Sequence, residues 1–142
     1  MKKIFVAATF TNKVDYESGQ VLDSYKSWLV DTLSLIERAG YETYCSLKID
    51  DFSVNDENPV DAVNRNFDEI KQADGFLALI DEKVSAGVQT EIGAALAWGK
   101  PILMAHEPRI NLQWINKAIL ESGKAGKCTL PLTQEKLHKF FE

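Results

Sequence analysis

The chain has 142 residues, a length that suits one domain with a sizeable core. Hydrophobic residues make up 45% of it and charged residues 26%, as in ordinary globular proteins, and the net charge is −5. This charge, without any basic run, argues against a nucleic-acid polymer or an anionic membrane surface as the main partner. No stretch has the length of a membrane span or the features of a signal peptide, and Cys45 and Cys128 lack metal-ligand spacing. We therefore expect a cytoplasmic protein with reduced thiols.

Short apolar runs alternate with amphipathic ones from the beginning of the chain. Residues 3–9 (KIFVAAT) predict a first strand that is apolar on both faces. Residues 20–39 carry apolar side chains at helical spacing, and Gly40 is placed to end that helix in a left-handed conformation. Residues 42–47 (ETYCSL) then predict a second strand.

The middle of the chain repeats this order. Residues 50–57 predict a polar, acidic loop whose spacing does not match a calcium-binding loop. Asn58 and Pro59 predict the start of a helix that runs to about residue 73. The apolar face expected for that helix consists of Val60, Val63, Phe67 and Ile70. Residues 75–80 (GFLALI) predict a central strand that is buried on both sides.

The last part of the chain predicts two more strands and three helices. The helices are expected at residues 91–99, 112–122 and 133–141, and the strands at residues 101–105 and 127–130. Strict alternation of strands and helices predicts an α/β fold. We expect a single three-layer domain over residues 1–142, with a five-stranded parallel sheet in flavodoxin-like (Rossmann-like) order. Ligands of such folds bind outside the carboxyl ends of the strands.

The segment after the central strand, DEKVSAGVQTE, carries the strongest functional signal. Ser85 and Gly87 are expected in a loop that leads into a helix, where free N–H groups and the helix dipole favour an anion. Glu91 is expected at or near the first turn, where the dipole should keep its carboxylate ionised. A carboxylate can attack an anomeric carbon. Acidic residues also occur in first helical turns for stability alone, so the spacing leaves both interpretations open.

The tip of the first strand offers a second set of candidates. It has no GxGxxG or phosphate-loop pattern, but Thr9, Thr11 and Asn12 have side chains that can bind a phosphate. Phe10 at the same tip is the best candidate for stacking on a base. For Trp98, packing is the better interpretation, and for His106 a structural position is favoured over a role in acid–base chemistry.

The run SAGVQTEIGAA, from Ser85 to Ala95, followed by GKPIL, resembles the nucleoside 2-deoxyribosyltransferase family. The resemblance extends to KIFVAATF, to QADGFLAL and more weakly to INLQW. It implies that Glu91 attacks C1′ of the sugar, that the base leaves, and that water or a second base resolves the glycosyl–enzyme ester. It also implies that no metal or organic cofactor is needed and that the protein is a homo-oligomer, at least a dimer.

Two positions depart from the family pattern. The first strand of the family carries a tyrosine that hydrogen-bonds the nucleophile, and the corresponding residue here is Phe5. An aspartate is expected 24 to 26 residues before the glutamate, where this chain has Asn66; Asp68 would project from a different face of the helix. Asparagine keeps its hydrogen bonds but cannot act as a general acid.

Ser85 bears on the 5′ end of the substrate. Family members that act on free nucleosides have an aspartate six residues before the nucleophile, whereas the branch that hydrolyses monophosphates has a serine there, as here. A hydroxyl and backbone N–H groups suit a phosphate, which a carboxylate would repel. The resemblance thus implies cleavage or transfer of the N-glycosidic bond of 2′-deoxynucleosides or their 5′-monophosphates, with Ser85 and Gly87 at the 5′ end. The alternative is a nucleotide-binding module of the same fold without turnover, which Phe5 and Asn66 favour.

Overall fold

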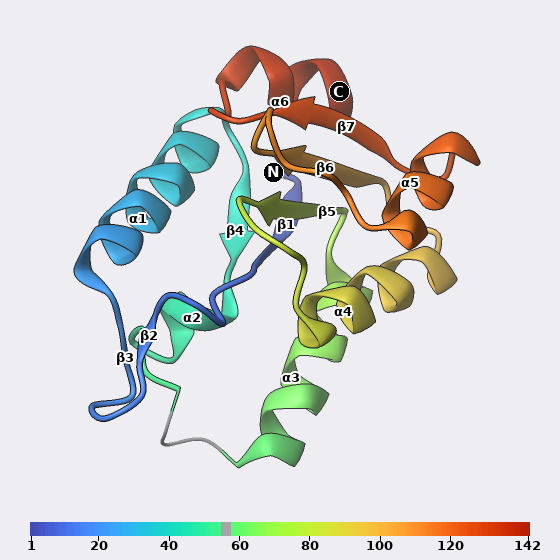
Figure 1. Ribbon diagram of the computed structural model, residues 1–142. Coiled ribbons are helices and arrows are strands. Elements are labelled where there is room, and N and C mark those ends of the chain that lie inside the picture. The colour runs from blue at the N-terminus through green and yellow to red at the C-terminus, as the bar shows by residue number, and fades with distance from the viewer. Residues whose placement is uncertain (55–57) are drawn as a thin grey trace.

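The computed structural model describes residues 1–54 and 58–142 and forms a three-layer α/β domain (Figure 1). The five main strands are β1 (Lys3–Ala8), β4 (Glu42–Tyr44), β5 (Gly75–Ile80), β6 (Ile102–His106) and β7 (Gly126–Thr129). They form one parallel sheet in the order β4-β1-β5-β6-β7. Numbered by their order in the chain, these strands run 2-1-3-4-5, which confirms the predicted flavodoxin-like topology.

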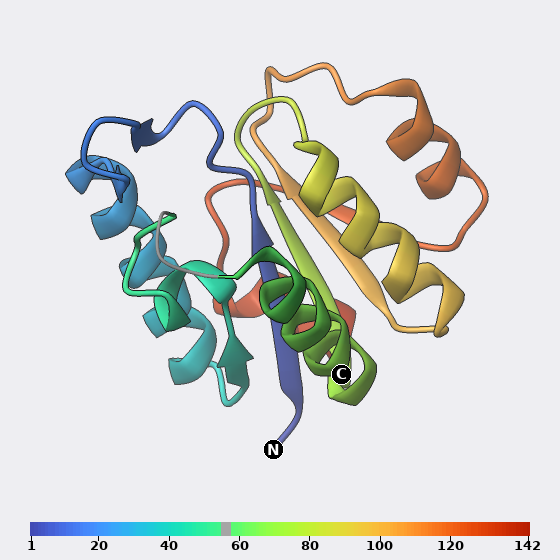
Figure 2. The ribbon, with the colours of Figure 1, turned by 90° about the horizontal axis from the view of Figure 1, so that it is seen from below.

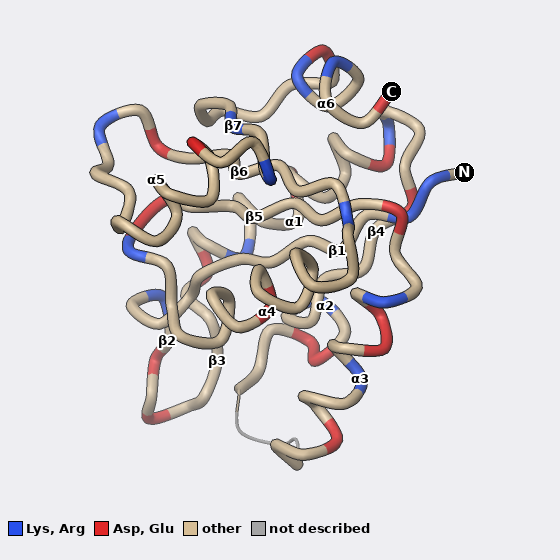
Figure 3. The backbone as a smooth tube through the Cα atoms, turned by 90° about the vertical axis from the view of Figure 1, so that its right-hand side faces the viewer, with Lys and Arg blue, Asp and Glu red and all other residues tan. Residues whose placement is uncertain are grey.

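Helices cover both faces of this sheet (Figures 1 and 2). One face packs against α1 (Asp23–Arg38) and α6 (Gln134–Phe141), and the other packs against α3 (Pro59–Gln72), α4 (Ala86–Ala97) and α5 (Trp114–Glu121). Strand side chains alternate between the two cores: Ile4 and Val6 face α1, whereas Phe5 and Ala7 face the α3–α4 side. Charged residues of both signs are scattered over helices and loops, and β5 carries none (Figure 3).

Several local predictions are confirmed. All residues of β5 are buried, as expected for the central strand of a parallel sheet. Gly40 has a φ of 101° after α1, and the side chain of Asn58 caps α3 by accepting hydrogen bonds from the N–H groups of Val60 and Asp61. Within the described residues, no helix combines the length and apolar character that a membrane span requires.

The segments before α1 and after β4 differ from the prediction. Helix α1 begins at Asp23 rather than residue 20, because Gln20–Val21 (β3) pairs with Val14–Asp15 (β2) in a short hairpin. Strand β4 ends at Tyr44, and the chain turns into a four-residue helix, α2 (Ser46–Ile49). Residues 50–54 of the predicted loop are described, and 55–57 lie outside the described residues.

The part of α3 that packs on the sheet is shorter than the predicted apolar face. Ile70 is fully buried and Phe67 is partly buried, but Val60 and Val63 are 67% and 50% exposed. Only the C-terminal half of the helix packs over the sheet, as Figure 1 also indicates by the projection of its first turns beyond the strands. Apolar periodicity alone does not show where a helix leaves the sheet that it covers.

Candidate active site

A cavity of about 550 Å³ opens beside the carboxyl-terminal half of β1. Strand β4 pairs with β1 only from Lys3 to Phe5, whereas β1 continues to Ala8 and pairs with β5 along that length. The space that a longer β4 would fill is left to the cavity, between β1 and helices α2, α3 and α4. Its lining residues are Phe5, Val6, Ala7, Ala8, Phe10, Thr11, Cys45, Ser46, Leu47, Val63, Asn66, Phe67, Ser85, Ala86, Gly87, Val88, Thr90 and Glu91.

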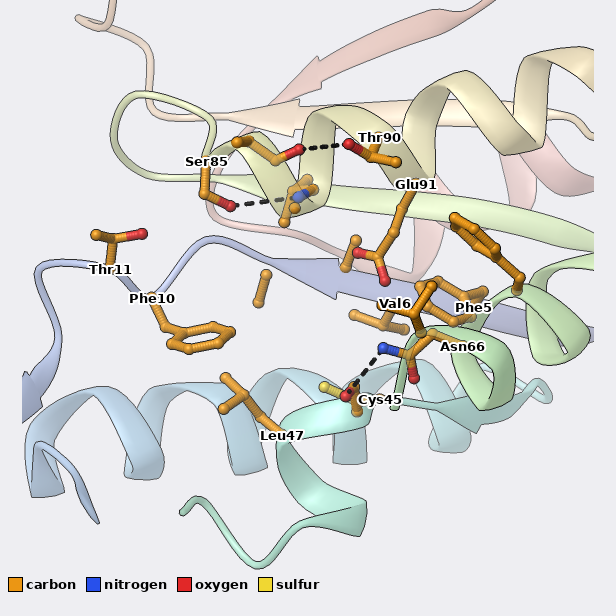
Figure 4. Close-up of a pocket in the computed structure, with 18 residues that line it drawn as sticks. Phe5, Val6, Phe10, Thr11, Cys45, Leu47, Asn66, Ser85, Thr90 and Glu91 are labelled. Carbon is orange, nitrogen blue, oxygen red and sulfur yellow. Dashed lines mark hydrogen bonds between the residues drawn. The ribbon is translucent and has the colours of Figure 1, made fainter. Parts of the chain in front are cut away.

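Glu91 points from α4 into this cavity, above Val6 and toward Asn66 (Figure 4). Helix α4 begins at Ala86, five residues earlier than predicted, so that Gly87 lies in the first turn and Glu91 in the second. Ser85 explains the early start, because its hydroxyl accepts a hydrogen bond from the N–H of Val88, 3.3 Å away. The type of this cap residue was the sequence signal for the true helix start.

The ionisation expected for Glu91 is wrong. Burial raises the pKa of this carboxyl from 4.5 to about 7, and no described residue donates a hydrogen bond to it. The helix dipole acts mainly within the first turn, which Glu91 has left, so it does not offset the lost hydration. At neutral pH the charged and the neutral form of this carboxyl are therefore both populated.

The N-terminus of α4 forms one end of the cavity. Ser85, Gly87 and the strand-tip residue Thr11 all line it, and no Lys or Arg occurs among the described lining residues. The first N–H groups of a helix have no partner within the helix and can bind an anion. An anionic group bound here would therefore depend on backbone N–H groups and hydroxyls rather than on a side-chain cation.

Phe5 lies in a row of aromatic rings across three strands. Its ring centroid is 5.5 Å from that of Tyr44 on β4 and 5.4 Å from that of Phe76 on β5, and both pairs are stacked. Phe5 is 1% exposed, so its ring forms the floor of the cavity near Glu91 without supplying a polar group. Tyr44 supplies the hydroxyl of this row, and it donates a hydrogen bond to Asn66 Oδ1 at 3.1 Å.

The structure brings most of the predicted site residues together; Thr9 and Asn12 are the exceptions and do not line the cavity. Phe5, Phe10, Asn66, Ser85, Gly87 and Glu91 all line the cavity. Thr9 is fully buried and does not line it; its hydroxyl accepts a hydrogen bond from the N–H of Ser85. Thr9 thus supports the loop before α4.

The other candidates lie elsewhere. His106, Trp98 and Asp68 do not line the cavity. Trp98 packs edge-on against Phe67, with ring centroids 6.2 Å apart, and Nδ1 of His106 lies 3.0 Å from the carbonyl oxygen of Glu107.

Sequence reasoning missed the contribution of the segment after β4. Cys45, Ser46 and Leu47 line the cavity because β4 ends early and α2 turns the chain inward. Burial raises the pKa of the Cys45 thiol to about 11, so this thiol stays neutral. Among the described residues, no group of three or more His, Cys, Asp or Glu side chains is placed to hold a metal ion.

The model of one protein family, nucleoside 2-deoxyribosyltransferase, matches residues 21–124. The chain belongs to the nucleoside 2-deoxyribosyltransferase family. The matched range includes Asn66, Ser85 and Glu91, whereas Phe5 and Phe10 precede it. No curated protein sequence matches the chain.

Solved structures support the fold of this family member. The CMP N-glycosidase BcmB of Clostridium botulinum is similar, with a TM-score of 0.65, 22% identity and coverage of 97% of each chain. The 2-deoxyribosyltransferase of Bacillus psychrosaccharolyticus has a TM-score of 0.58 at 18% identity, over 80% of this chain and 78% of that one. At these identities, the likeness establishes the three-layer fold and leaves the reaction to be argued from the cavity.

Proposed function

We propose that this family member cleaves or transfers the N-glycosidic bond of nucleosides or their 5′-monophosphates, with Glu91 as the nucleophile. The observation that carries this proposal is the position of Glu91: a carboxyl group with a pKa of about 7 that points into a mostly apolar cavity. A purely structural glutamate would be solvated or paired, because burying an unpaired carboxyl costs free energy. A nucleophile benefits from that same poor solvation.

The reaction follows the two-step course of a retaining glycosidase. A carboxylate oxygen of Glu91 forms a bond to C1′ while the C1′–N bond breaks, and the bonding electrons leave with the base. Water, or a second base, then attacks C1′ and releases the carboxylate. Asn66 can donate a hydrogen bond to the leaving base but no proton, so the base takes its proton from solvent.

We place the 5′ end of the substrate at the N-terminus of α4. Ser85, Gly87 and Thr11 lie together there, and the helix end favours an anion. A serine at position 85 suits a phosphate better than a carboxylate would. We therefore favour 5′-monophosphates, and we include CMP beside the deoxynucleotides because the similar BcmB is a CMP N-glycosidase.

A non-catalytic nucleotide-binding module is the second candidate. Phe5 supplies no hydroxyl to Glu91, and Asn66 supplies no acid, so the tyrosine and the aspartate of the family pattern are both absent. The cavity itself would remain able to hold a nucleoside. This module would bind nucleotides without releasing the base.

The test is base release from dCMP, dAMP, dGMP, TMP, CMP and the corresponding nucleosides, followed by chromatography. We expect release by the wild type and at least about a thousandfold less by Glu91→Gln, which keeps the shape of the side chain. Glu107→Gln is the matched control, because Glu107 lies at the same sheet edge but lines a separate hollow. Thermal stabilisation by a nucleotide without any base release would identify the binding module instead.

A second pair of substitutions tests the assignment of the missing groups. Phe5→Tyr combined with Asn66→Asp restores the hydroxyl and the acid that the family carries, and we expect release to become faster. Failure of both the wild type and this double variant to release any base would reject the glycosidic reaction. Homo-oligomerisation, a cytoplasmic location and independence from cofactors stay predictions that size measurement, fractionation and dialysis against a chelator can check.

A further inference from the structure

The cavity wall below Glu91 contains a hydrogen-bond network that joins Asn66 to Tyr44 and Ser46. Tyr44 donates to Asn66 Oδ1 at 3.1 Å, and Asn66 Nδ2 lies 3.4 Å from the hydroxyl oxygen of Ser46. Asn66 and Ser46 line the cavity, whereas Tyr44 lies behind them and is 7% exposed. Figure 4 shows the Asn66 amide below the Glu91 carboxylate, with its nitrogen on the side of the dashed hydrogen bond.

Arg65 determines which groups of this network donate hydrogen bonds and which accept them. Its guanidinium makes two hydrogen bonds to Asp50, of 2.9 and 3.0 Å, and a third of 3.1 Å to the hydroxyl oxygen of Ser46. A guanidinium only donates hydrogen bonds, so the Ser46 oxygen acts as the acceptor. Burial raises the pKa of Tyr44 to about 12, while the nearby Arg65 charge lowers it, so the phenol stays protonated with its oxygen beside a positive charge.

These contacts select one of the two orientations of the Asn66 amide. A neighbouring cation favours a phenol whose oxygen faces it and whose hydrogen points away, and here that hydrogen is donated to Asn66 Oδ1. Were the amide reversed, its N–H₂ would meet the Tyr44 hydroxyl, and the hydrogen bond from the phenol to Asn66 Oδ1 would be lost. Losing a hydrogen bond from a buried phenol costs free energy, so the reversed orientation is disfavoured.

We propose that Tyr44 is a positioning residue that holds Asn66 with its amide N–H toward the cavity, so that the wall facing Glu91 donates hydrogen bonds to the leaving base. This inference rests on the proposed function, since a displaced group departs on the side opposite the nucleophile. The group bound at Asn66 must then be an acceptor, such as the carbonyl oxygen or an unprotonated ring nitrogen of a nucleobase. Its growing negative charge is stabilised there without proton transfer.

The orientation can be measured in the free protein by NMR, whether or not it turns over. In ¹⁵N-labelled wild type, with the Asn66 side-chain signals assigned by their loss in Asn66→Leu, we expect NOEs from the amide protons to Ser46 and none to the ring of Tyr44. In Tyr44→Phe we expect additional NOEs to the ring at position 44, because only the 3.4 Å contact with Ser46 then opposes reversal of the amide. Tyr41→Phe is the matched control, since the Tyr41 hydroxyl bonds to Glu142 away from the cavity.

Base release tests the consequence for catalysis. We expect Tyr44→Phe to lower kcat about tenfold with KM within about twofold, because the donor acts on the leaving base in the transition state. Tyr41→Phe should leave both constants unchanged. In the Asn66→Leu background, Tyr44→Phe should have no further effect, because Tyr44 acts only through Asn66.

The outcomes separate this inference from the proposed function. NOEs from the wild-type amide to the ring of Tyr44, or an unchanged pattern in Tyr44→Phe, overturn the positioning role even if base is released. Additive losses in the double variant overturn it as well. The expected NOE pattern without any base release keeps the orientation and rejects the reaction that it was proposed to assist.

Discussion

The backbone N–H of Ser85 donates a hydrogen bond to the hydroxyl of Thr9, and the two atoms are 3.3 Å apart. Thr9 follows β1 and is fully buried, so this contact fastens the N-terminus of α4 to the end of the neighbouring strand. The Ser85 hydroxyl in turn caps α4 through the N–H of Val88. The proposed 5′ site is therefore built on two fixed elements rather than on a free loop.

Ser85→Asp should distinguish monophosphates from free nucleosides. Aspartate caps helices about as well as serine, so the melting temperature should change little. Its carboxylate repels a phosphate, and we expect KM for the monophosphate to rise at least about tenfold while KM for the nucleoside stays within about twofold. Steady-state kinetics with both forms of one nucleoside measure the difference. Equal losses with both substrates would place the 5′ end elsewhere.

The rate of base release should depend on the ionisation of Glu91. Only the carboxylate is a nucleophile, and burial raises the pKa of this group to about 7. We expect kcat/KM to increase with pH, to reach half its maximum near pH 7, and to level off above pH 8. An acid limb centred between pH 4 and 5 would contradict a buried, unassisted carboxyl.

The same carboxyl should make the fold less stable at alkaline pH. Because its folded pKa of about 7 exceeds the value of 4.5 expected when unfolded, the folded state binds the proton more tightly, and stability is lost as pH rises from 4.5 through 7. Glu91→Gln should thus match the wild type near pH 4 and be more stable at pH 8.5, by an amount on the order of 3 kcal/mol.

Urea unfolding at both pH values measures this difference. Glu121→Gln, at an exposed position of α5, is the control for the general effect of replacing a glutamate. A stability gain of Glu91→Gln that is the same at pH 4 and pH 8.5 would show that protonation of Glu91 is not its cause.

Two glycines should respond to alanine in opposite directions. A Cβ at Gly75, on β5, would lie 2.6 Å from Cε1 of Phe141 and 3.0 Å from Cδ1 of Ile4, so Gly75→Ala should destabilise by about 1–3 kcal/mol. A Cβ at Gly93, in the interior of α4, would meet nothing within 4 Å. Gly93→Ala should stabilise by about 0.5–1 kcal/mol, because glycine is a poor helix former. Thermal unfolding of the two variants checks both signs.

The central position of β5 was predictable, because a strand buried on both faces has a continuous apolar sequence, as residues 75–80 do. The end of β4 was not predictable in this way. Residues 42–47 have ordinary strand composition, and only the cavity beside β1 explains why pairing stops at Tyr44. The same applies to α3, whose apolar face continues past the edge of the sheet.

The sequence predicted several residues that line the cavity, but it did not predict their hydrogen-bond network or the ionisation of Glu91. Glu91, Ser85 and Asn66 follow from the family resemblance, and they do line one cavity. The network around Asn66 joins β4 to α3. Tyr44 and Asn66 are 22 residues apart in the sequence, and no local sequence pattern predicts a contact between them. The predicted ionisation of Glu91 was wrong because the burial of this carboxyl depends on tertiary packing, which the position of Glu91 in its helix does not reveal.

The unpaired carboxyl of Glu91 also bears on which replacements the fold alone would favour at this position. Mutation supplies many neutral or apolar replacements for a glutamate, and at this position they would relieve the burial of a charge. A lineage that needed only a folded scaffold would drift toward those replacements. An unpaired acid at this position of α4 costs stability, so it is better explained by an action of the carboxyl on a ligand than by a role in the fold.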